Sequence, residues 1–153
     1  MNLPNKQSVI VAIKNKIAAT KANITESLES ERFAIQQETK SSAGDKYETQ
    51  REMIQADIRR SEAQLEETKM NEEMMEHFHD FKGAVILGTL VQLSQGNNQL
   101  FVFLGPAVGD ILVEGQKIKT ISSGSPFGQM LMGKHQGDSF TFNEKSFTLL
   151  SCY

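Results

Sequence analysis

Two long segments suited to helices are separated by only a short connection, and this arrangement constrains the fold more than any other feature of the chain. Residues 6–40 and 46–76 contain neither glycine nor proline. Both are rich in Glu, Gln, Lys and Arg, which favour helices. The connection, residues 41–44, is short enough that the two helices must be antiparallel neighbours.

A seven-residue apolar repeat runs along the first of these segments. Ile10, Ile17 and Ile24 occur at this spacing, and Ile54 and Ile58 lie one turn apart in the second segment. Such a repeat is typical of the seam of a coiled coil. The sequence therefore predicts a long antiparallel coiled coil, and 30 residues of helix extend roughly 45 Å.

Composition changes sharply along the chain, which has 153 residues. Residues 1–80 contain one glycine and carry a charge of −4, whereas residues 81–153 contain ten glycines and carry +1. We expect two domains of different architecture: a coiled-coil domain over 1–80 with its tip at 41–48, and a second domain over 81–153.

The second half has the pattern of a small antiparallel sheet. Apolar runs flank the turn signal QGNN at residues 95–98, a further strand is expected at 116–122, and a hairpin is expected around residues 143–144. Between these strands, residues 125–133 predict a short helix with a serine cap, a proline at its first position and a glycine stop. The predicted fold class is α+β.

Bulk properties limit the range of functions. The net charge of −3 gives no long-range attraction to nucleic acid, and the single cysteine, Cys152, fits a reducing compartment. We expect a cytoplasmic protein, since no apolar run reaches the length of a membrane span and the start lacks the pattern of a secretory signal. No phosphate-binding glycine loop, nucleophile elbow or zinc-ligand spacing is present, so we expect no catalytic activity of its own and no intrinsic cofactor or metal.

Asp45 and Glu48 are the main candidate site residues, because they stand at the bend. In one interpretation they cap the second helix, with Asp45 at the N-cap and Glu48 at the spacing of a capping box. In the other, they help to hold a divalent cation that a larger partner also binds. Mg²⁺ takes few protein carboxylates and keeps several waters, so two carboxylates need such a partner.

Other conspicuous residues have ordinary explanations. His77 and His79 diverge on a helix and do not suggest a metal site. Methionines 70, 74, 75, 130 and 132 are expected to be packing residues. Five phenylalanines could line a binding pocket, but their alternation favours a core: Phe101, Phe103, Phe127, Phe140 and Phe142.

Two segments of the second half, FVFLGPAVGD (101–110) and KIKTISSGSPFGQMLMGKHQGDSFTF (117–142), resemble the C-terminal domain of the Gre transcript-cleavage factors. In that family a Val-Gly-Pro segment ends a strand and a Ser-Pro-Leu-Gly segment opens a short helix. Leu104–Pro106 and Ser125–Gly128 take these places here. The resemblance extends to the tip pattern Gly-Asp-x-x-Glu and to the layout of the whole chain, and it implies an FKBP-like sheet domain.

The resemblance implies a bacterial transcription elongation factor that binds RNA polymerase through the secondary channel, with DNA binding as an associated property. The tip carboxylates would share Mg²⁺ with the polymerase active site, which then cleaves backtracked nascent RNA. Indirect contact with that RNA, a monomeric state and no membrane association are also expected. The implied site residues are Asp45 and Glu48 for cleavage, and Lys46, Arg51, Ser125, Pro126, Phe127 and Gly128 for partner binding.

Two alternatives remain open. After the tip, the family carries Asn-Ala-Glu-Tyr, whereas residues 49–52 here are Thr-Gln-Arg-Glu. A secondary-channel regulator or inhibitor without cleavage stimulation is therefore one alternative, akin to Gre-related inhibitors or to regulators of nucleoside diphosphate kinase. The other is a prolyl isomerase or chaperone that acts through the sheet domain.

Overall fold

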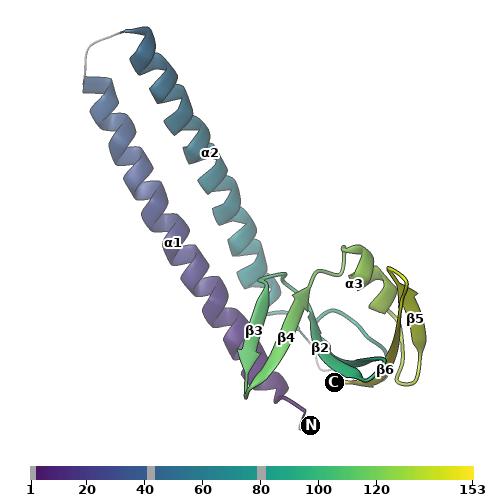
Figure 1. The fold of residues 1–153 in the computed structure, drawn as a ribbon. Helices are drawn as coiled ribbons and strands as arrows, with labels where there is room; N and C mark the ends of the chain where they lie inside the picture. Colours follow the sequence, from purple (N-terminus) through teal and green to yellow (C-terminus); the bar gives the residue numbers. More distant parts are fainter. Residues whose placement is uncertain (1–2, 41–43, 79–81) are drawn as a thin grey trace. The chain divides into compact units, whose positions relative to one another are not determined.

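Two long helices precede a six-stranded sheet in the computed structural model (Figure 1). The structure describes residues 3–40, 44–78 and 82–153, with the backbone alone for 38–40 and Asp45. It forms two compact units: residues 17–72, and residues 1–16 together with 73–153. The predicted domains, 1–80 and 81–153, stay a prediction, since compactness alone does not show which part folds independently.

The predicted helices are confirmed. Helix α1 covers Lys6–Lys40 and helix α2 covers Asp45–Met74. Asn5 caps α1, because its side-chain oxygen accepts from the Ser8 N–H at 3.1 Å. Most of the predicted connection, residues 41–43, lies outside the described residues. None of the described helices combines the length and apolar composition that a membrane crossing needs.

Residues 17–72 form an antiparallel helical hairpin (Figure 1). Lys21 Nζ lies 2.8 Å from Glu72 Oε2, and Arg32 Nη2 lies 3.1 Å from Glu62 Oε1. The partner's number falls as the α1 number rises, which is the register of an antiparallel pair. Exposed ion pairs contribute little to stability, so burial in the seam must carry most of the pairing energy.

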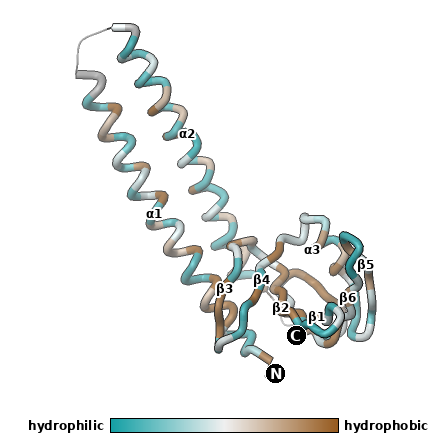
Figure 2. Tube along the Cα trace, viewed as in Figure 1, coloured by the Kyte–Doolittle hydropathy of each residue, from teal (hydrophilic) through white to brown (hydrophobic). Residues whose placement is uncertain are grey.

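The seam of the hairpin is more polar than the apolar repeat predicts. In α1, Ile17 and Leu28 are buried, but in α2 the most buried positions of the hairpin are Ser61 and Thr68. Ser61 Oγ donates to Glu31 Oε1 at 3.1 Å, and Thr68 Oγ1 donates to the Gln64 carbonyl at 2.7 Å. Figure 2 shows hydrophilic and hydrophobic residues interspersed along both helices.

The sheet has the strand order β3-β4-β2-β1-β6-β5. The α+β class is confirmed, as are the predicted β1–β2 and β5–β6 hairpins. Strand β3 was not predicted, and β2 pairs with β4 in parallel, so the sheet is mixed rather than wholly antiparallel. The strands are β1 Leu90–Gln95, β2 Asn98–Leu104, β3 Asp110–Val113, β4 Gln116–Ile121, β5 Ser139–Phe142 and β6 Lys145–Cys152.

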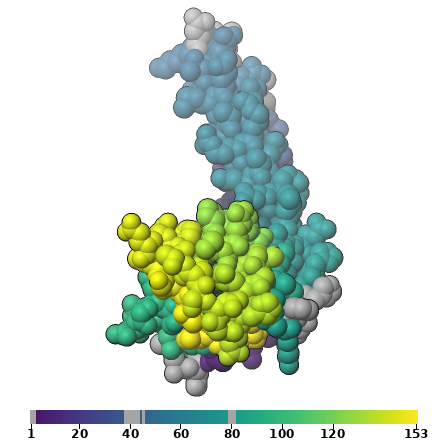
Figure 3. Space-filling model, turned by 90° about the vertical axis from the view of Figure 1, so that its right-hand side faces the viewer, coloured from purple at the N-terminus to yellow at the C-terminus, as the bar shows by residue number. Residues whose placement is uncertain are grey.

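Alternation along β2 divides the sheet unit into two layers of packing. Phe101 and Phe103 point to one face, where the Phe78 ring lies 5.7 Å from that of Phe103. Val102 and Leu104 point to the other face and belong to a core cluster that includes α3 and the β5–β6 hairpin. In Figure 3 these last segments, yellow-green and yellow, lie next to each other at the surface.

The predicted short helix is confirmed as α3, Pro126–Leu131. Ser125 is its N-cap, with the side-chain oxygen accepting from the Gly128 N–H at 3.1 Å, and Pro126 takes the first helical position. Gly133 follows the helix with φ 77°, a backbone conformation that favours glycine. The local stop and start signals therefore decide the limits of this helix.

Replacing Gly128 by alanine is expected to lower the free energy of unfolding by about 1–3 kcal/mol. A Cβ at this position would overlap the Ser122 carbonyl oxygen, which is backbone and cannot rotate away. Urea unfolding followed by circular dichroism measures the effect. Gly124→Ala is the matched control, because its Cβ would meet only Ser122 Oγ at 3.7 Å. Equal losses in the two variants would contradict the steric explanation.

The phenol of Tyr153 links stability to high pH. The Tyr153 and Leu90 backbones exchange two hydrogen bonds of 2.8 and 3.0 Å, and burial raises the pKa of Tyr153 to about 12. The unfolded chain ionises near pH 10. The stability contributed by this group is therefore fully present below pH 10 and is lost as the pH rises through 12. In alkaline unfolding experiments, Tyr153→Phe should lose less stability over this interval than the unmodified chain, and an equal loss would contradict the assignment.

Candidate functional site

The N-cap residue of α2 is not the one that the sequence predicts. The Gly44 carbonyl accepts from the Tyr47 N–H at 2.9 Å and from the Glu48 N–H at 3.2 Å. Gly44 is therefore the N-cap residue and Asp45 is the first residue of the helix. The prediction of Asp45 as the N-cap, with Glu48 completing a capping box, was wrong by one residue. Glycine is a good N-cap even without a side chain.

Moving Asp45 into the helix leaves both predicted carboxylates in or beside its first turn. Negative charge at this position interacts favourably with the positive end of the helix dipole. Residues three positions apart share a helix face, so the backbone places positions 45 and 48 on one side of α2. Glu48 is exposed, whereas the Asp45 side chain lies outside what the structure describes. The arrangement can present negative charge at the start of α2.

The predicted cations of this region are at the surface. Lys46 and Arg51 are both exposed, and Arg51 follows Glu48 on the same face by a further three residues. Exposed Lys and Arg side chains can contact the phosphates of a nucleic acid or carboxylates of a protein. Two exposed positive side chains therefore lie within a few residues of the two candidate carboxylates.

Most residues of the second predicted contact segment are occupied in building α3. Ser125 Oγ also donates to the Ser122 carbonyl at 2.7 Å, and Gly128 is buried. The Phe127 ring is half-buried among other rings, and only Pro126 is exposed. A role in partner binding stays a prediction for all four, and substitutions at three of them would disturb the fold as well.

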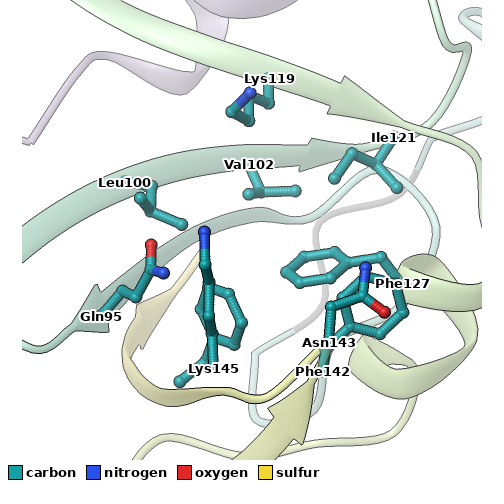
Figure 4. Close-up of a pocket in the computed structure, with 10 residues that line it drawn as sticks. Gln95, Leu100, Val102, Lys119, Ile121, Phe127, Phe142, Asn143 and Lys145 are labelled. Carbon is teal, nitrogen blue, oxygen red and sulfur yellow. The ribbon is translucent and has the colours of Figure 1, made fainter.

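A pocket of about 280 Å³ lies on the sheet face that carries α3 (Figure 4). Of the five phenylalanines expected in the core, Phe101, Phe103 and Phe140 are buried. Phe127 and Phe142 are half-buried instead and line this pocket together with Phe147. The alternation in sequence did not predict the pocket. It indicates on which face of the sheet a side chain lies, but not how closely other elements pack against that face.

No metal centre is formed by the residues that the structure describes: no three His, Cys, Asp or Glu side chains gather as ligands. His77 is exposed, and His79 lies outside the described residues. Among the methionines expected to pack, Met75 is buried but Met70, Met130 and Met132 are exposed. That expectation was therefore wrong for these three. Cys152 is half-buried, and burial raises the pKa of its thiol.

No family model matches this sequence, and no curated protein matches it. Among solved structures, the chain is similar to the GreA factor homolog 1 (Gfh1) protein of Thermus thermophilus, with 21% identity over 93% of this chain and 95% of that chain, and a TM-score of 0.38. A second structure of the transcription factor Gfh1 gives 21% identity, coverage of 93% and 94%, and a TM-score of 0.37. The structure of Thermus aquaticus Gfh1 gives 21% identity over 89% of this chain and 95% of that chain, with a TM-score of 0.37.

Proposed function

We propose that this chain is a Gre-like transcription elongation factor that enters the secondary channel of bacterial RNA polymerase and stimulates cleavage of backtracked RNA. One observation carries the proposal: a helical hairpin whose second helix begins at Asp45 and exposes Glu48 one turn later. The sequence resemblance to the Gre factors at Ser125–Gly128 and at the tip supports it independently.

The dimensions of the hairpin suit entry into a channel. Each helix with its side chains is about 10–12 Å wide, so two antiparallel helices can pass where a globular domain of this size cannot. The exposed ion pairs keep the surface of the hairpin compatible with a water-filled passage. Carboxylates at the start of α2 then arrive at the far end of that passage.

The proposed chemistry belongs to the polymerase, and this chain is an accessory factor rather than an enzyme. In two-metal hydrolysis, one cation activates the attacking water and the other stabilises the leaving oxygen. The polymerase holds one Mg²⁺ firmly, and Asp45 and Glu48 supply the extra negative charge that retains the second. Mg²⁺ keeps most of its waters and needs only one or two protein carboxylates. The chain therefore needs no intrinsic metal site.

The remaining predicted residues bind the partner. Lys46 and Arg51 contact phosphates or polymerase carboxylates once the hairpin is inserted, which also brings the chain close to nascent RNA. Pro126, exposed at the start of α3, contacts the polymerase as part of the Ser125–Gly128 segment. The factor acts as a cytoplasmic monomer.

Cleavage of RNA in arrested elongation complexes tests the proposal. Stalled, backtracked complexes are incubated with Mg²⁺ and with or without the chain, and the release of short 3′ fragments is measured together with the resumption of synthesis. Added chain should increase both. Binding of the chain to polymerase without fragment release would reject cleavage stimulation.

A second candidate is a secondary-channel regulator that slows synthesis without cleavage. Lys46 and Arg51 favour it, because two exposed cations close to the carboxylates reduce the net negative charge available to hold Mg²⁺. The same assay separates the two candidates, since such a regulator lowers the elongation rate and releases no fragments.

A further inference from the structure

The pocket on the α3 face of the sheet is built by four segments. Val102 comes from β2 and Ile121 from β4, Phe127 comes from α3, and Phe142 and Lys145 flank the β5–β6 turn. Figure 4 shows Phe127 reaching from α3 into the space below these strands. These four segments of the chain therefore enclose one concave site.

The floor of the pocket is apolar and firmly held. The Phe127 ring lies 5.1 Å from the Phe142 ring and 5.3 Å from the Phe147 ring, and both pairs are edge-to-face. Leu100 and Val102 supply the β2 side of the floor. Aromatic pairs of this geometry stabilise one another beyond simple burial, so the site is formed before any ligand arrives.

The rim of the pocket is positively charged. Lys119 and Lys145 line it, the other polar lining residues are Gln95 and Asn143, and no carboxylate is among the lining residues. In Figure 4 the Lys145 side chain extends from the β5–β6 turn toward β2. Among the described residues, Lys145 forms no ion pair. Lys119 Nζ lies 3.9 Å from Asp110 Oδ1, whereas Lys117 Nζ lies only 2.7 Å from the other oxygen of that carboxylate, Oδ2. The Lys145 ammonium group is therefore available to an anionic ligand, and the Lys119 ammonium group is held only by a long contact that a ligand carboxylate can replace.

We propose that this pocket binds a small carboxylate that carries one aromatic or branched aliphatic group. The apolar part lies on the phenylalanine floor, and the carboxylate lies between the Lys119 and Lys145 ammonium groups. The volume is close to the lower limit of ligand pockets, which suits a ligand of one or two rings rather than a large macrocycle. A rim with two cations and no carboxylate selects against neutral and cationic ligands of the same shape.

Binding is tested on the full chain by proton–nitrogen correlation NMR with naphthaleneacetate and its neutral amide, naphthaleneacetamide. We expect the carboxylate to shift the backbone amides of the lining residues with a Kd of roughly 10 μM to 1 mM. The amide should bind at least about threefold more weakly, since it lacks the charge that the two lysines recognise. The spectra themselves report whether each protein is folded.

Variants of the rim provide the second arm. The double variant Lys119→Gln/Lys145→Gln should weaken naphthaleneacetate at least about threefold and leave the amide unchanged. Lys82→Gln is the matched control, since it removes an exposed lysine of the same unit that does not line the pocket. We expect the control variant to bind naphthaleneacetate with the same affinity as the unmodified chain.

Three outcomes would overturn the proposal: equal affinity for the carboxylate and the amide, equal affinity of the double variant and the control, or shifts located away from the pocket. Tighter binding of an acidic peptide containing one phenylalanine would also overturn it, because the site would then be a docking point for a protein segment. None of these readouts involves polymerase, so they are independent of the proposed role in transcription.

Discussion

Replacing Asp45 by asparagine is expected to reduce stimulated RNA cleavage by at least about tenfold while polymerase affinity changes by less than about twofold. Asparagine keeps the shape of the side chain and removes the negative charge that, in the proposed function, helps to retain the second Mg²⁺. Because position 45 is the first residue of α2 and not its N-cap, the substitution leaves the Gly44 carbonyl and its two hydrogen bonds in place. Fragment release and a competition binding assay, run on the same preparations, measure the two effects.

The matched control for this experiment is Asp57→Asn. Asp57 lies on the same helix, pairs with Arg60 at 3.2 Å, and is twelve residues further along, which is roughly 18 Å of helix. We expect both cleavage and affinity to be unchanged in this variant. If Asp45→Asn loses binding and cleavage in equal measure, the carboxylate has a docking role and the assignment to Mg²⁺ is wrong. Raising the Mg²⁺ concentration should partly rescue Asp45→Asn, because the weakened site then fills by mass action.

Replacing Phe103 by alanine is expected to lower the free energy of unfolding by about 3–5 kcal/mol. Its side chain is fully buried on β2, the Phe78 ring packs against it at 5.7 Å, and a Cβ at Gly105 would come within 2.7 Å of it. The neighbouring backbone is fixed by the sheet and cannot collapse into the cavity that alanine leaves. A loss of this size is a large part of the stability of a small domain.

Phe33→Ala supplies the control for the core substitution. The Phe33 side chain is 64% exposed on α1, and alanine is a better helix former. We expect its effect on unfolding to stay within about 0.5 kcal/mol. Urea titration of both variants by circular dichroism measures the difference. Similar midpoints for the two variants would show that the Phe103 side of the sheet is not a tightly packed layer.

Much of the candidate site was predictable from sequence, and the error in it has a local cause. The absence of glycine and proline from two long segments fixed the hairpin and placed Asp45 and Glu48 at its bend. The cap was misplaced by one residue because Gly44 and Asp45 are both acceptable N-caps. Which carbonyl accepts the first helical hydrogen bond depends on the backbone path through the turn, and residue type does not encode that path.

The sequence by itself determined the elements whose signals are local: both long helices, the two β-hairpins, and the start and stop of α3. Such signals act over a few residues through capping, turn conformation and helix propensity. Only the tertiary structure decided the parallel pairing of β2 with β4, the burial of Ser61 and Thr68 in the hairpin seam, and the gathering of Phe127, Phe142 and Phe147 around a pocket. These features depend on which residues, distant in sequence, come into contact. The residues that neighbour a serine, threonine or phenylalanine in the sequence do not indicate which distant side chains will pack against it.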